Sequence, residues 1–408
     1  MNKKNLIVGQ SGGPTAVINS SLYGVVSEAL CHPDVIGKVY GMVNGIAGFL
    51  QDTVMDLAKE LPGQKLEILK TTPGAYLGSC RYKLPEDLSD PVYPRLFSKF
   101  EELDIGYFFY IGGNDSMDTV SKLSRYAERT GSDLIVLGEP KTIDNDLVLT
   151  DHTPGFGSAA RYVASTVREI VTDACVYRTK SVTIIEIMGR HAGWLTAASA
   201  LARKYPGDNP LYIYLPETSF EEDAFLEKIQ GALHTVDNVI VCVSEGIHDK
   251  DGTFICEYGS SVGTDSFGHK MLAGCGKYLE NLVREKLNVK VRSIELNVSQ
   301  RCSSVMISAA DQQEAVMAGQ FGVHAALAGE TGKMIAFERI SDDPYAVRCT
   351  LEDVNEICNQ EKTVPMEWIT PDGADVTEEF LTYARPLVKG TVEVPMDEYG
   401  LPYFVYRD

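Results

Sequence analysis

Short apolar runs that end in polar, glycine-containing loops recur along the chain. Each run has the length and the β-branched or aromatic content of a buried strand rather than the alternation of a half-exposed one. Several of them are followed at once by residues suited to binding small molecules. On this basis strands are expected at residues 5–9, 106–111, 133–138, 182–188, 211–215 and 239–244.

Between these runs the apolar residues recur with helical spacing, as Ile18, Leu22, Val25 and Ala29 do in 16–30. Further helices are expected at 160–171, 191–204, 221–235, about 270–287 and 313–327, whereas 83–99, with three prolines, is expected to be irregular. Alternating strands and helices predict parallel sheets covered on both faces. With 408 residues the predicted fold class is α/β, with two doubly wound, Rossmann-like parallel-sheet domains.

Composition restricts the possible partners and the compartment. No apolar run reaches the roughly 18 residues of a membrane span, and Met1–Asn5 leads into a strand without a signal segment, so a cytoplasmic location is expected. Nine cysteines without a Cys-x-x-Cys pair predict reduced thiols, and the seven histidines show no zinc-site spacing. A formal charge of −20 argues against nucleic acid and membrane partners.

The first strand is followed by Gly12 and Gly13 and then by a helix. Backbone N–H groups at such a helix start carry the positive end of the helix dipole and favour a phosphate. The spacing is neither the Rossmann fingerprint nor a Walker A motif, which disfavours a nicotinamide cofactor. A tight turn without a ligand remains the alternative.

The loop after the strand at 133–138 reads Lys141-Thr-Ile-Asp-Asn-Asp146. If this loop is extended, its period of two places Thr142, Asp144 and Asp146 on one face. Two carboxylates beside a lysine suit the removal of a proton from a hydroxyl close to a phosphate. A polar turn stabilised by its Asp and Asn residues is the alternative interpretation.

Four strand-to-loop junctions, at Gly12-Gly13, Gly112–Ser116, Lys141–Asp146 and Met188-Gly189-Arg190, resemble the phosphofructokinase family in sequence and in order. The resemblance covers roughly residues 5 to 345. It implies the phosphofructokinase fold, phosphoryl transfer to fructose 6-phosphate, and Mg²⁺ as cofactor. It also implies a homodimer or homotetramer with the active site near a subunit interface.

The resemblance divides the chain into two domains. Residues 1–155 with about 300–345 would bind the phosphoryl donor. Residues 156–299 with about 346–408 would form the fructose 6-phosphate-binding domain and a C-terminal extension.

Two positions bear on the donor. Family members that use ATP typically have glycine where Asp115 and Lys141 stand, and pyrophosphate-dependent members have Asp and Lys. An aspartate there occupies the place of a nucleotide α-phosphate and repels it, whereas pyrophosphate stops short of it. We therefore expect pyrophosphate as the donor. The alternatives are an ATP-dependent enzyme and a non-catalytic, sugar-phosphate-binding regulatory subunit.

The resemblance also assigns roles to individual residues, with Asp144 as the general base for the sugar 1-hydroxyl. The expected catalytic residues are Asp144, Lys141, Asp115 and Arg81. The expected pyrophosphate-binding residues are Gly12, Gly13, Arg81, Asp115 and Lys141. The expected fructose 6-phosphate-binding residues are Thr142, Ile143, Asp144, Met188, Gly189, Arg190, Glu245, Arg292 and Arg301.

Some of these positions have simpler interpretations or depart from the family. Taken alone, Arg81 could be a surface arginine and Glu245 a loop carboxylate. Asn114 stands where family members place an aspartate that helps to hold the metal, and it is the candidate Mg²⁺ ligand; capping of a helix near Ser116 is its alternative role. Val298 replaces a histidine that is common in the family.

Overall fold

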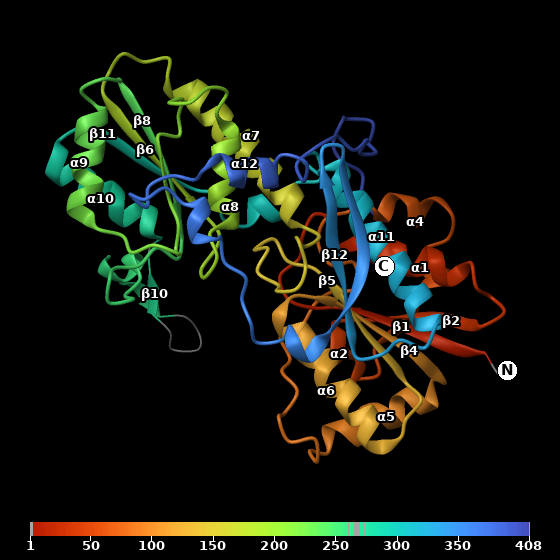
Figure 1. The fold of residues 1–408 in the computed structure, drawn as a ribbon. Coiled ribbons are helices and arrows are strands. Elements are labelled where there is room, and N and C mark those ends of the chain that lie inside the picture. Colours follow the sequence, from red (N-terminus) through yellow and green to blue (C-terminus); the bar gives the residue numbers. More distant parts are fainter. Residues whose placement is uncertain (1–2, 260, 265–269, 273, 408) are drawn as a thin grey trace. The chain divides into compact units, whose positions relative to one another are not determined.

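The computed structural model describes residues 3–259, 261–264, 270–272 and 274–407, which form two compact units (Figure 1). Unit 1 comprises Met1–Ser158, Arg301–Gln360 and Leu387–Asp408, and unit 2 comprises Ala159–Gln300 and Glu361–Pro386. The expectation that 346–408 belongs wholly to the second domain is therefore wrong. The reason is that 345–353 pairs with the sheet of unit 1, and Ser308 binds the carbonyls of Leu387 and Lys389.

Unit 1 is built on a seven-stranded sheet in the order β13-β12-β5-β4-β1-β2-β3. Its strands are β1 (Lys4–Gln10), β2 (Ile36–Met42), β3 (Val54–Asp56), β4 (Ile105–Gly112), β5 (Ile135–Pro140), β12 (Lys333–Asp342) and β13 (Tyr345–Asp353). The central strands are parallel, and only the edge strands β3 and β13 are antiparallel to their neighbours. The chain passes from β1 to β2 on one side and later to β4 on the other, so the strand order reverses between β1 and β4. In open α/β sheets this switch point is where ligands bind.

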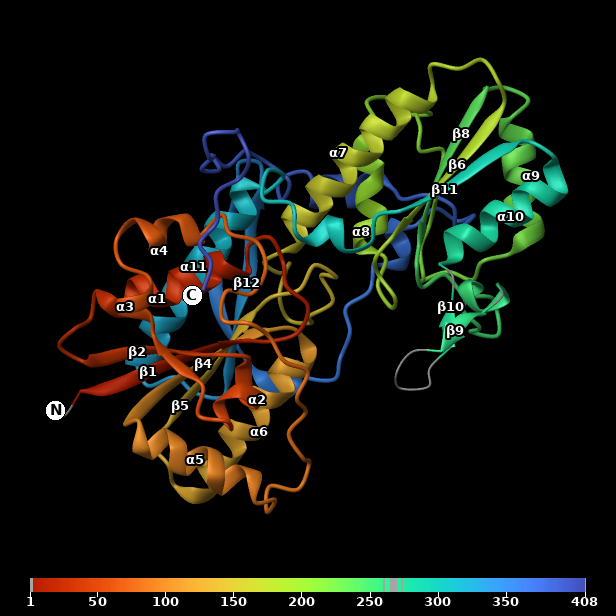
Figure 2. The ribbon, with the colours of Figure 1, turned by 180° about the vertical axis from the view of Figure 1, so that it is seen from behind.

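Helices cover both faces of this sheet (Figures 1 and 2). The helices of unit 1 are α1 (Ile18–Leu30), α2 (Gly45–Phe49), α3 (Leu57–Glu60), α4 (Gln64–Leu69), α5 (Val92–Glu102), α6 (Asn114–Thr130) and α11 (Ala309–Leu327), with the short η4 (Val354–Glu356). Successive residues of one strand pack on opposite faces: Leu6 and Val8 belong to the core under α1 and α11, and Ile7 to the core under α5 and α6. The buried, non-alternating character of the predicted strands follows from this double cover.

Unit 2 contains a four-stranded, fully parallel sheet in the order β11-β6-β8-β7 and a separate β9-β10 hairpin. Its strands are β6 (Ser181–Ile187), β7 (Tyr212–Tyr214), β8 (Asn238–Ser244), β9 (Ser261–Thr264), β10 (Lys270–Leu272) and β11 (Lys290–Glu295). The helices are α7 (Phe156–Ala174), α8 (Trp194–Ala197), α9 (Glu222–Ala232), α10 (Cys275–Leu287) and α12 (Glu378–Ala384), with the 3₁₀ segments η1 (Ala198–Ala202), η2 (Ile255–Tyr258), η3 (Asn297–Arg301) and η5 (Met366–Trp368). The predicted α/β class with two doubly wound sheets is confirmed.

Three expected elements differ from the structure. The second half of the expected irregular stretch 83–99 belongs to α5, because Pro94 lies in the first turn, where its missing N–H is not needed, and Asp90 accepts from the Val92 N–H at 2.9 Å. The helix expected at 191–204 is reduced to α8 and η1. Of the helix expected from Lys270, residue 273 lies outside the described residues, Lys270–Leu272 is strand β10, and α10 begins only after Gly274.

No helix within the described ranges is long and apolar enough to cross a membrane.

Candidate active site

The loops that follow β1, β4 and β5 meet at the carboxyl edge of the unit 1 sheet. Ser11 donates its backbone N–H to the carbonyl of Ile111 at 2.9 Å, and Lys141 donates its own to the carbonyl of Gly112 at 3.0 Å. These bonds extend the parallel pairing by one residue beyond the strands. The Gly12-Gly13 turn, the start of α6 and the Lys141 loop are thereby brought side by side at the switch point between β1 and β4.

Lys141 lies buried against the glycine turn. Its Nζ donates to the carbonyl of Gly13 at 2.6 Å, and only 3% of the residue is exposed. Burial lowers the pKa of Lys141 to about 8, although the carboxylates of Asp144 and Asp146 act in the opposite direction. Lys141 is therefore a desolvated cation, and its two acidic neighbours partly offset the lowering of its pKa by burial.

Two cationic side chains lie close to the glycines of the turn. Gly12 has a φ of +76°, and a Cβ there would lie 3.3 Å from Nζ of Lys141. A Cβ on Gly13 would lie 2.8 Å from Nη1 of Arg301. Arg301, expected to bind the sugar phosphate, thus has its guanidinium against the turn expected to bind the donor, within unit 1. Two cations converge on one pair of glycines.

The candidate catalytic loop, Lys141–Asp146, is not extended, so the expected alternation of Thr142, Asp144 and Asp146 on one face is wrong. Asn145 has a φ of +56° and is fully buried, and this left-handed residue interrupts the period of two. Thr142 and Ile143 are buried, whereas Asp144 and Asp146 are half-buried. Thr142 Oγ1 also accepts from the N–H of Asp144 at 3.1 Å, as in the polar turn weighed as the alternative.

Arg81 extends from a loop that is bonded to the glycine turn. Ser79 Oγ donates to the carbonyl of Gly12 at 2.7 Å, and the N–H of Gly12 donates to the carbonyl of Cys80 at 3.5 Å. The backbone preceding Arg81 is thus held at the turn while the Arg81 residue itself is exposed.

Asp115 lies in the first turn of α6 and is exposed. Lys83 Nζ approaches Asp115 Oδ1 at 3.0 Å, and this hydrogen bond raises the pKa of Lys83. Lys83 was not among the expected site residues, and its position two residues after Arg81 was the available signal. Lys83, with its long flexible side chain, is therefore a second cation beside Arg81 at this edge of the sheet.

Asn114 does not cap the helix, so that alternative is wrong: the N-cap of α6 is Gly113. Instead the Asn114 amide binds a distant segment. Its Nδ2 donates to the carbonyl of Gln360 at 2.5 Å and its Oδ1 accepts from the N–H of Asn359 at 2.6 Å. The side chain expected to face a metal thus also holds residues 359–360 beside the start of α6.

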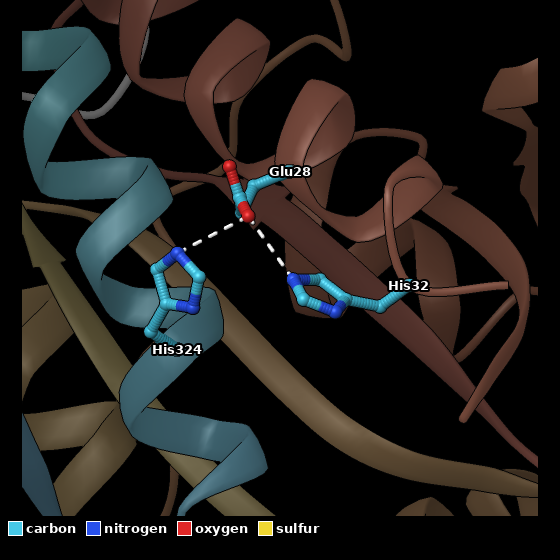
Figure 3. A group of neighbouring side chains, drawn as sticks. All are labelled: Glu28, His32 and His324. Atoms are coloured by element: carbon cyan, nitrogen blue, oxygen red, sulfur yellow. Dashed lines mark hydrogen bonds and ion pairs between the residues drawn. The ribbon is translucent and has the colours of Figure 1, made fainter. Parts of the chain in front are cut away.

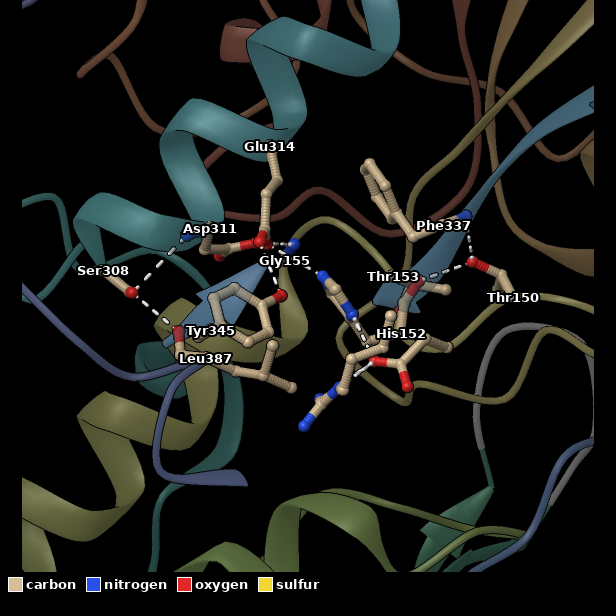
Figure 4. Close-up of polar contacts among 12 residues, drawn as sticks. Thr150, His152, Thr153, Gly155, Ser308, Asp311, Glu314, Phe337, Tyr345 and Leu387 are labelled. Carbon is tan, nitrogen blue, oxygen red and sulfur yellow. Dashed lines mark hydrogen bonds and ion pairs between the residues drawn. The ribbon is translucent and has the colours of Figure 1, made fainter. Parts of the chain in front are cut away.

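A buried polar network behind the catalytic loop was missed (Figure 4). The two ring nitrogens of His152 lie 2.8 Å from Asp151 Oδ2 and 2.8 Å from Glu314 Oε2, and Tyr345 donates to Glu314 at 2.6 Å. Burial acts against the charge, but the two carboxylates prevail and raise the pKa of His152 to about 9. Arg339 pairs with Asp151 at 2.9 Å and completes the charge balance.

The network reaches the catalytic loop through Thr153. Its Oγ1 donates to the carbonyl of Thr142 at 2.8 Å, and its N–H donates to Asn145 Oδ1 at 3.1 Å. Next to it, the buried Asp311 on α11 accepts from the N–H groups of Gly155 and Ser158, each at 2.8 Å. Residues brought from α11, β12 and β13 therefore fix the backbone of 142–158. Their separation along the chain explains why no local pattern revealed them.

In unit 2, Met188-Gly189-Arg190 after β6 and Glu245 after β8 lie side by side. Ser244 Oγ donates to the carbonyl of Gly189, and the N–H of Glu245 donates to that of Ile187 at 2.9 Å. Gly246 permits the contact, because a Cβ there would lie 1.8 Å from the carbonyl oxygen of Arg190. Arg190 is exposed and Glu245 half-buried, so a cation and an anion are presented together.

The remaining expected sugar contact, Arg292, is exposed on the edge strand β11, where it pairs with Thr183. A further carboxyl was missed at this end of the sheet. Glu186 is largely buried beneath the start of α10 and accepts from the N–H of Gly276 at 2.7 Å. Burial, followed by the charges of Glu295 and Glu245, raises the pKa of Glu186 to about 7.

Comparison with known proteins places these features in context. The family described as phosphofructokinase matches residues 5–328. The pyrophosphate–fructose 6-phosphate 1-phosphotransferase of Halomonas elongata is 39% identical over 406 residues, which cover 98% of this chain and 96% of that protein.

Two solved structures are similar over nearly the whole chain. The pyrophosphate-dependent phosphofructokinase from Marinobacter aquaeolei has a TM-score of 0.88 at 38% identity and covers 98% of this chain and 95% of its own. The pyrophosphate-dependent phosphofructokinase from Nitrosospira multiformis has a TM-score of 0.90 at 35% identity, with 99% and 96% covered.

Proposed function

The chain belongs to the phosphofructokinase family, and we propose that it transfers a phosphoryl group from pyrophosphate to the 1-hydroxyl of fructose 6-phosphate. The products are fructose 1,6-bisphosphate and phosphate, and the step is reversible. The names of the similar proteins support this reaction over the ATP-dependent and the non-catalytic alternatives.

The observation that carries the proposal is the position of Lys141 and Asp115 around the glycine turn. The ammonium of Lys141 reaches the carbonyl of Gly13, and Asp115 lies in the first turn of the neighbouring helix α6. A compact cation at the turn suits a donor that lacks a nucleoside to anchor it. The exposed carboxylate of Asp115 repels a further phosphate group. A nucleotide, which continues beyond the point where pyrophosphate ends, is therefore disfavoured.

The catalytic roles follow the requirements of phosphoryl transfer, which depends on positioning and charge stabilisation more than on covalent catalysis. In the proposal Asp144 accepts the proton of the 1-hydroxyl as it attacks. Lys141 and Arg81 stabilise charge on the transferring group and, with Gly12 and Gly13, bind pyrophosphate.

The proposed contacts of fructose 6-phosphate are chosen by the chemistry of their side chains and by the family resemblance. Hydroxyl and carboxylate groups are suited to the sugar, and arginines to its phosphate. The proposed contacts are Thr142, Ile143, Asp144, Met188, Gly189, Arg190, Glu245, Arg292 and Arg301.

A divalent metal, proposed to be Mg²⁺, fits the oxygen donors of the donor site. The amide oxygen of Asn114 and the carboxylates of Asp115, Asp144 and Asp146 are the hard ligands that Mg²⁺ prefers. When bound with pyrophosphate, the metal would neutralise charge on the phosphate oxygens. Asn114 offers no charge and its oxygen already accepts from Asn359, so the substrate phosphates supply most of the negative charge.

Donor preference in a double variant tests the proposal. Asp115→Gly with Lys141→Gly removes the repelling carboxylate and the cation, and should lower the ratio of kcat/KM for pyrophosphate to that for ATP by at least about tenfold. Lys250→Gly with Asp251→Gly is the charge-matched control, on an exposed turn of unit 2. An unchanged ratio in the site variant would refute the donor assignment, and no turnover by the unmodified protein with either donor would indicate a non-catalytic subunit.

A further inference from the structure

Glu28, His32 and His324 converge on the surface of unit 1, away from the residues assigned to the reaction (Figure 3). Glu28 lies in the last turn of α1, His32 follows the end of that helix by two residues, and His324 projects from α11. Glu28 Oε1 lies 3.0 Å from Nε2 of His32 and 3.1 Å from Nε2 of His324. The three candidate ligand atoms lie within 4.8 Å of one another.

We propose that these three side chains bind a divalent transition metal ion, with zinc as the reference ion. Two imidazoles and one carboxylate form a donor set typical of zinc sites that keep a further position for water. Metal–ligand distances of about 2.0–2.1 Å in a tetrahedral site place neighbouring ligand atoms roughly 3.3 Å apart. The two short distances in the group are therefore within a few tenths of an ångström of the required spacing.

The backbone that carries the ligands is held rigidly. α1 and α11 pack so closely that a Cβ on Gly24 would lie 2.3 Å from the carbonyl oxygen of Val316, and one on Gly319 would lie 2.5 Å from that of Ser21. The helices cannot approach further, and their buried apolar contacts oppose separation. Glu28 and His324, which lie within these helices, are therefore largely preorganised, which reduces the ordering cost of binding.

The exposure of the three side chains suits entry of an ion from solvent. The side chain of Glu28 is 16% exposed, that of His32 31% and that of His324 58%. The carboxylate is the most shielded ligand, so its attraction for a cation is weakened least by water and salt. The histidines complete the site from the solvent side.

The ligand type separates this site from the Mg²⁺ proposed with pyrophosphate. Imidazole nitrogen suits Zn²⁺, Ni²⁺, Cu²⁺ and Co²⁺, whereas Mg²⁺ requires oxygen ligands and water. Distance separates them too: the glycine turn precedes the start of α1, the new site lies at the other end of this helix, and its 13 residues span about 20 Å.

The expected consequence is a clamp between α1 and α11. An ion that binds these helices only in the folded protein stabilises that state by mass action. The histidine spacing along the chain predicted no zinc site, and His324 is indeed far from His32 in the sequence. The helical spacing of Glu28 and His32 was the one local signal.

Titration of the metal-stripped, untagged full-length protein tests the proposal. Co²⁺ should give a visible absorption spectrum of a protein-bound ion that saturates at one equivalent, and Zn²⁺ should displace it and raise the Tm by a few degrees. Both effects should persist in excess Mg²⁺. Glu28→Gln and His324→Gln should each weaken Co²⁺ binding by at least about tenfold, because each removes one of three ligands.

The control is His234→Gln, an exposed histidine of unit 2, which should bind like the unmodified protein. Since His324 is largely exposed, its replacement leaves the fold intact, and a comparable Tm without metal verifies this. Absence of a saturable Co²⁺ spectrum, or a spectrum undiminished in both ligand variants, would overturn the proposal. In that case the group is a carboxylate hydrogen-bonded to two imidazoles.

Discussion

Lys141 concentrates the chemistry of the donor site in one residue. It is a desolvated cation, and burial alone would favour its neutral form. Asp144 and Asp146 oppose that effect, whereas Arg301 adds to it. With a pKa of about 8, Lys141 is mainly charged at neutral pH but loses its proton at a pH where an ordinary lysine keeps it.

Pyrophosphate capture should therefore weaken in mildly alkaline solution. Because the lowered pKa is that of the free enzyme, kcat/KM for pyrophosphate should fall as the pH rises through about 8. Lys141→Met should have a lower kcat/KM for pyrophosphate at neutral pH and should lack the decrease at alkaline pH. Steady-state rates from pH 6.5 to 9.5 give kcat/KM for the unmodified protein and for the variant. An identical alkaline decrease in Lys141→Met would mean that another group causes the decrease.

Asp144 should affect turnover more than binding. Asp144→Ser removes the proposed base but keeps a small polar side chain, so kcat should fall by a factor on the order of 10² to 10⁴. The KM for fructose 6-phosphate should change by no more than a few fold. Asp251→Ser on the exposed turn of unit 2 is the control, and near-normal turnover of Asp144→Ser would mean that another group is the base.

The family resemblance predicted the neighbours of Lys141 but not their conformations. It grouped Gly12, Gly13 and Lys141 as pyrophosphate-binding residues, and all three follow strands whose carboxyl ends share one edge of the sheet. The left-handed Asn145 and the bonds from Asn114 to residues 359–360 were not foreseen. Both depend on tertiary contacts with residues distant in sequence, which periodicity does not report.

At the scale of elements, the catalytic loop depends on strands and helices that follow it in sequence. Asp151 and His152 pair with Glu314 of α11 and Arg339 of β12, and Thr153 transmits their position to Thr142 and Asn145. Because the pKa of His152 is raised to about 9, the folded protein keeps a proton that the unfolded chain releases near pH 6.5. This contribution to stability is complete below that pH and is lost as the pH rises through about 9.

Replacing His152 should reveal that contribution. His152→Gln should lower the free energy of unfolding at pH 6.5 by an amount on the order of 2 kcal/mol, and by less at pH 9.5. Burial also raises the pKa of Glu139 to about 8, so the stability contribution of this group also falls as the pH rises. This effect is the same in the unmodified protein and in His152→Gln, and it cancels in the difference between their free energies of unfolding. Urea unfolding at pH 6.5 and 9.5 measures the difference in the free energy of unfolding between the two proteins. If the loss of unfolding free energy in His152→Gln grew with pH, the charged state assigned to His152 would be contradicted. His234→Gln is the control.

The crossing of α1 and α11 makes a second prediction for an element. Gly319→Ala would place a Cβ 2.5 Å from the carbonyl oxygen of Ser21, so the variant should lose about 1–3 kcal/mol of unfolding free energy. Gly231→Ala near the end of α9 meets no atom within 4 Å and should be neutral or stabilise by up to about 1 kcal/mol. Thermal or urea unfolding compares the two, and equal effects would argue against the close crossing.

Strands were easier to predict than short helices. The buried strands have no polar face, and their apolar runs identify them directly. By contrast, α5 lies in a proline-containing stretch and depends on Asp90 for the start of its first turn. The helix expected at 191–204 ends early because the chain changes to the 3₁₀ segment η1. The type of the long, buried elements followed from periodicity, whereas α5, the strand β10 and the ends of elements depended on individual local contacts.

For the whole molecule, a charge of −20 and two anionic substrates are compatible because the cations are local. Lys141 and Arg301 meet the glycine turn directly, and Arg81 and Lys83 extend from the adjoining loop. Screening over about 10 Å at ordinary salt limits the influence of distant carboxylates. The C-terminal residues also serve unit 1: the N–H of Val405 donates to Thr72 at 3.1 Å, and Ser308 binds Leu387 and Lys389.

The most direct test compares the two donors with the unmodified protein. Purified enzyme with fructose 6-phosphate and Mg²⁺ is given pyrophosphate or ATP at equal concentration, and the products are followed by ³¹P NMR. We predict that each pyrophosphate consumed yields one orthophosphate and one fructose 1,6-bisphosphate, with ATP consumed at least about tenfold more slowly. Faster transfer from ATP than from pyrophosphate, or no sugar bisphosphate from either donor, would contradict the proposed function.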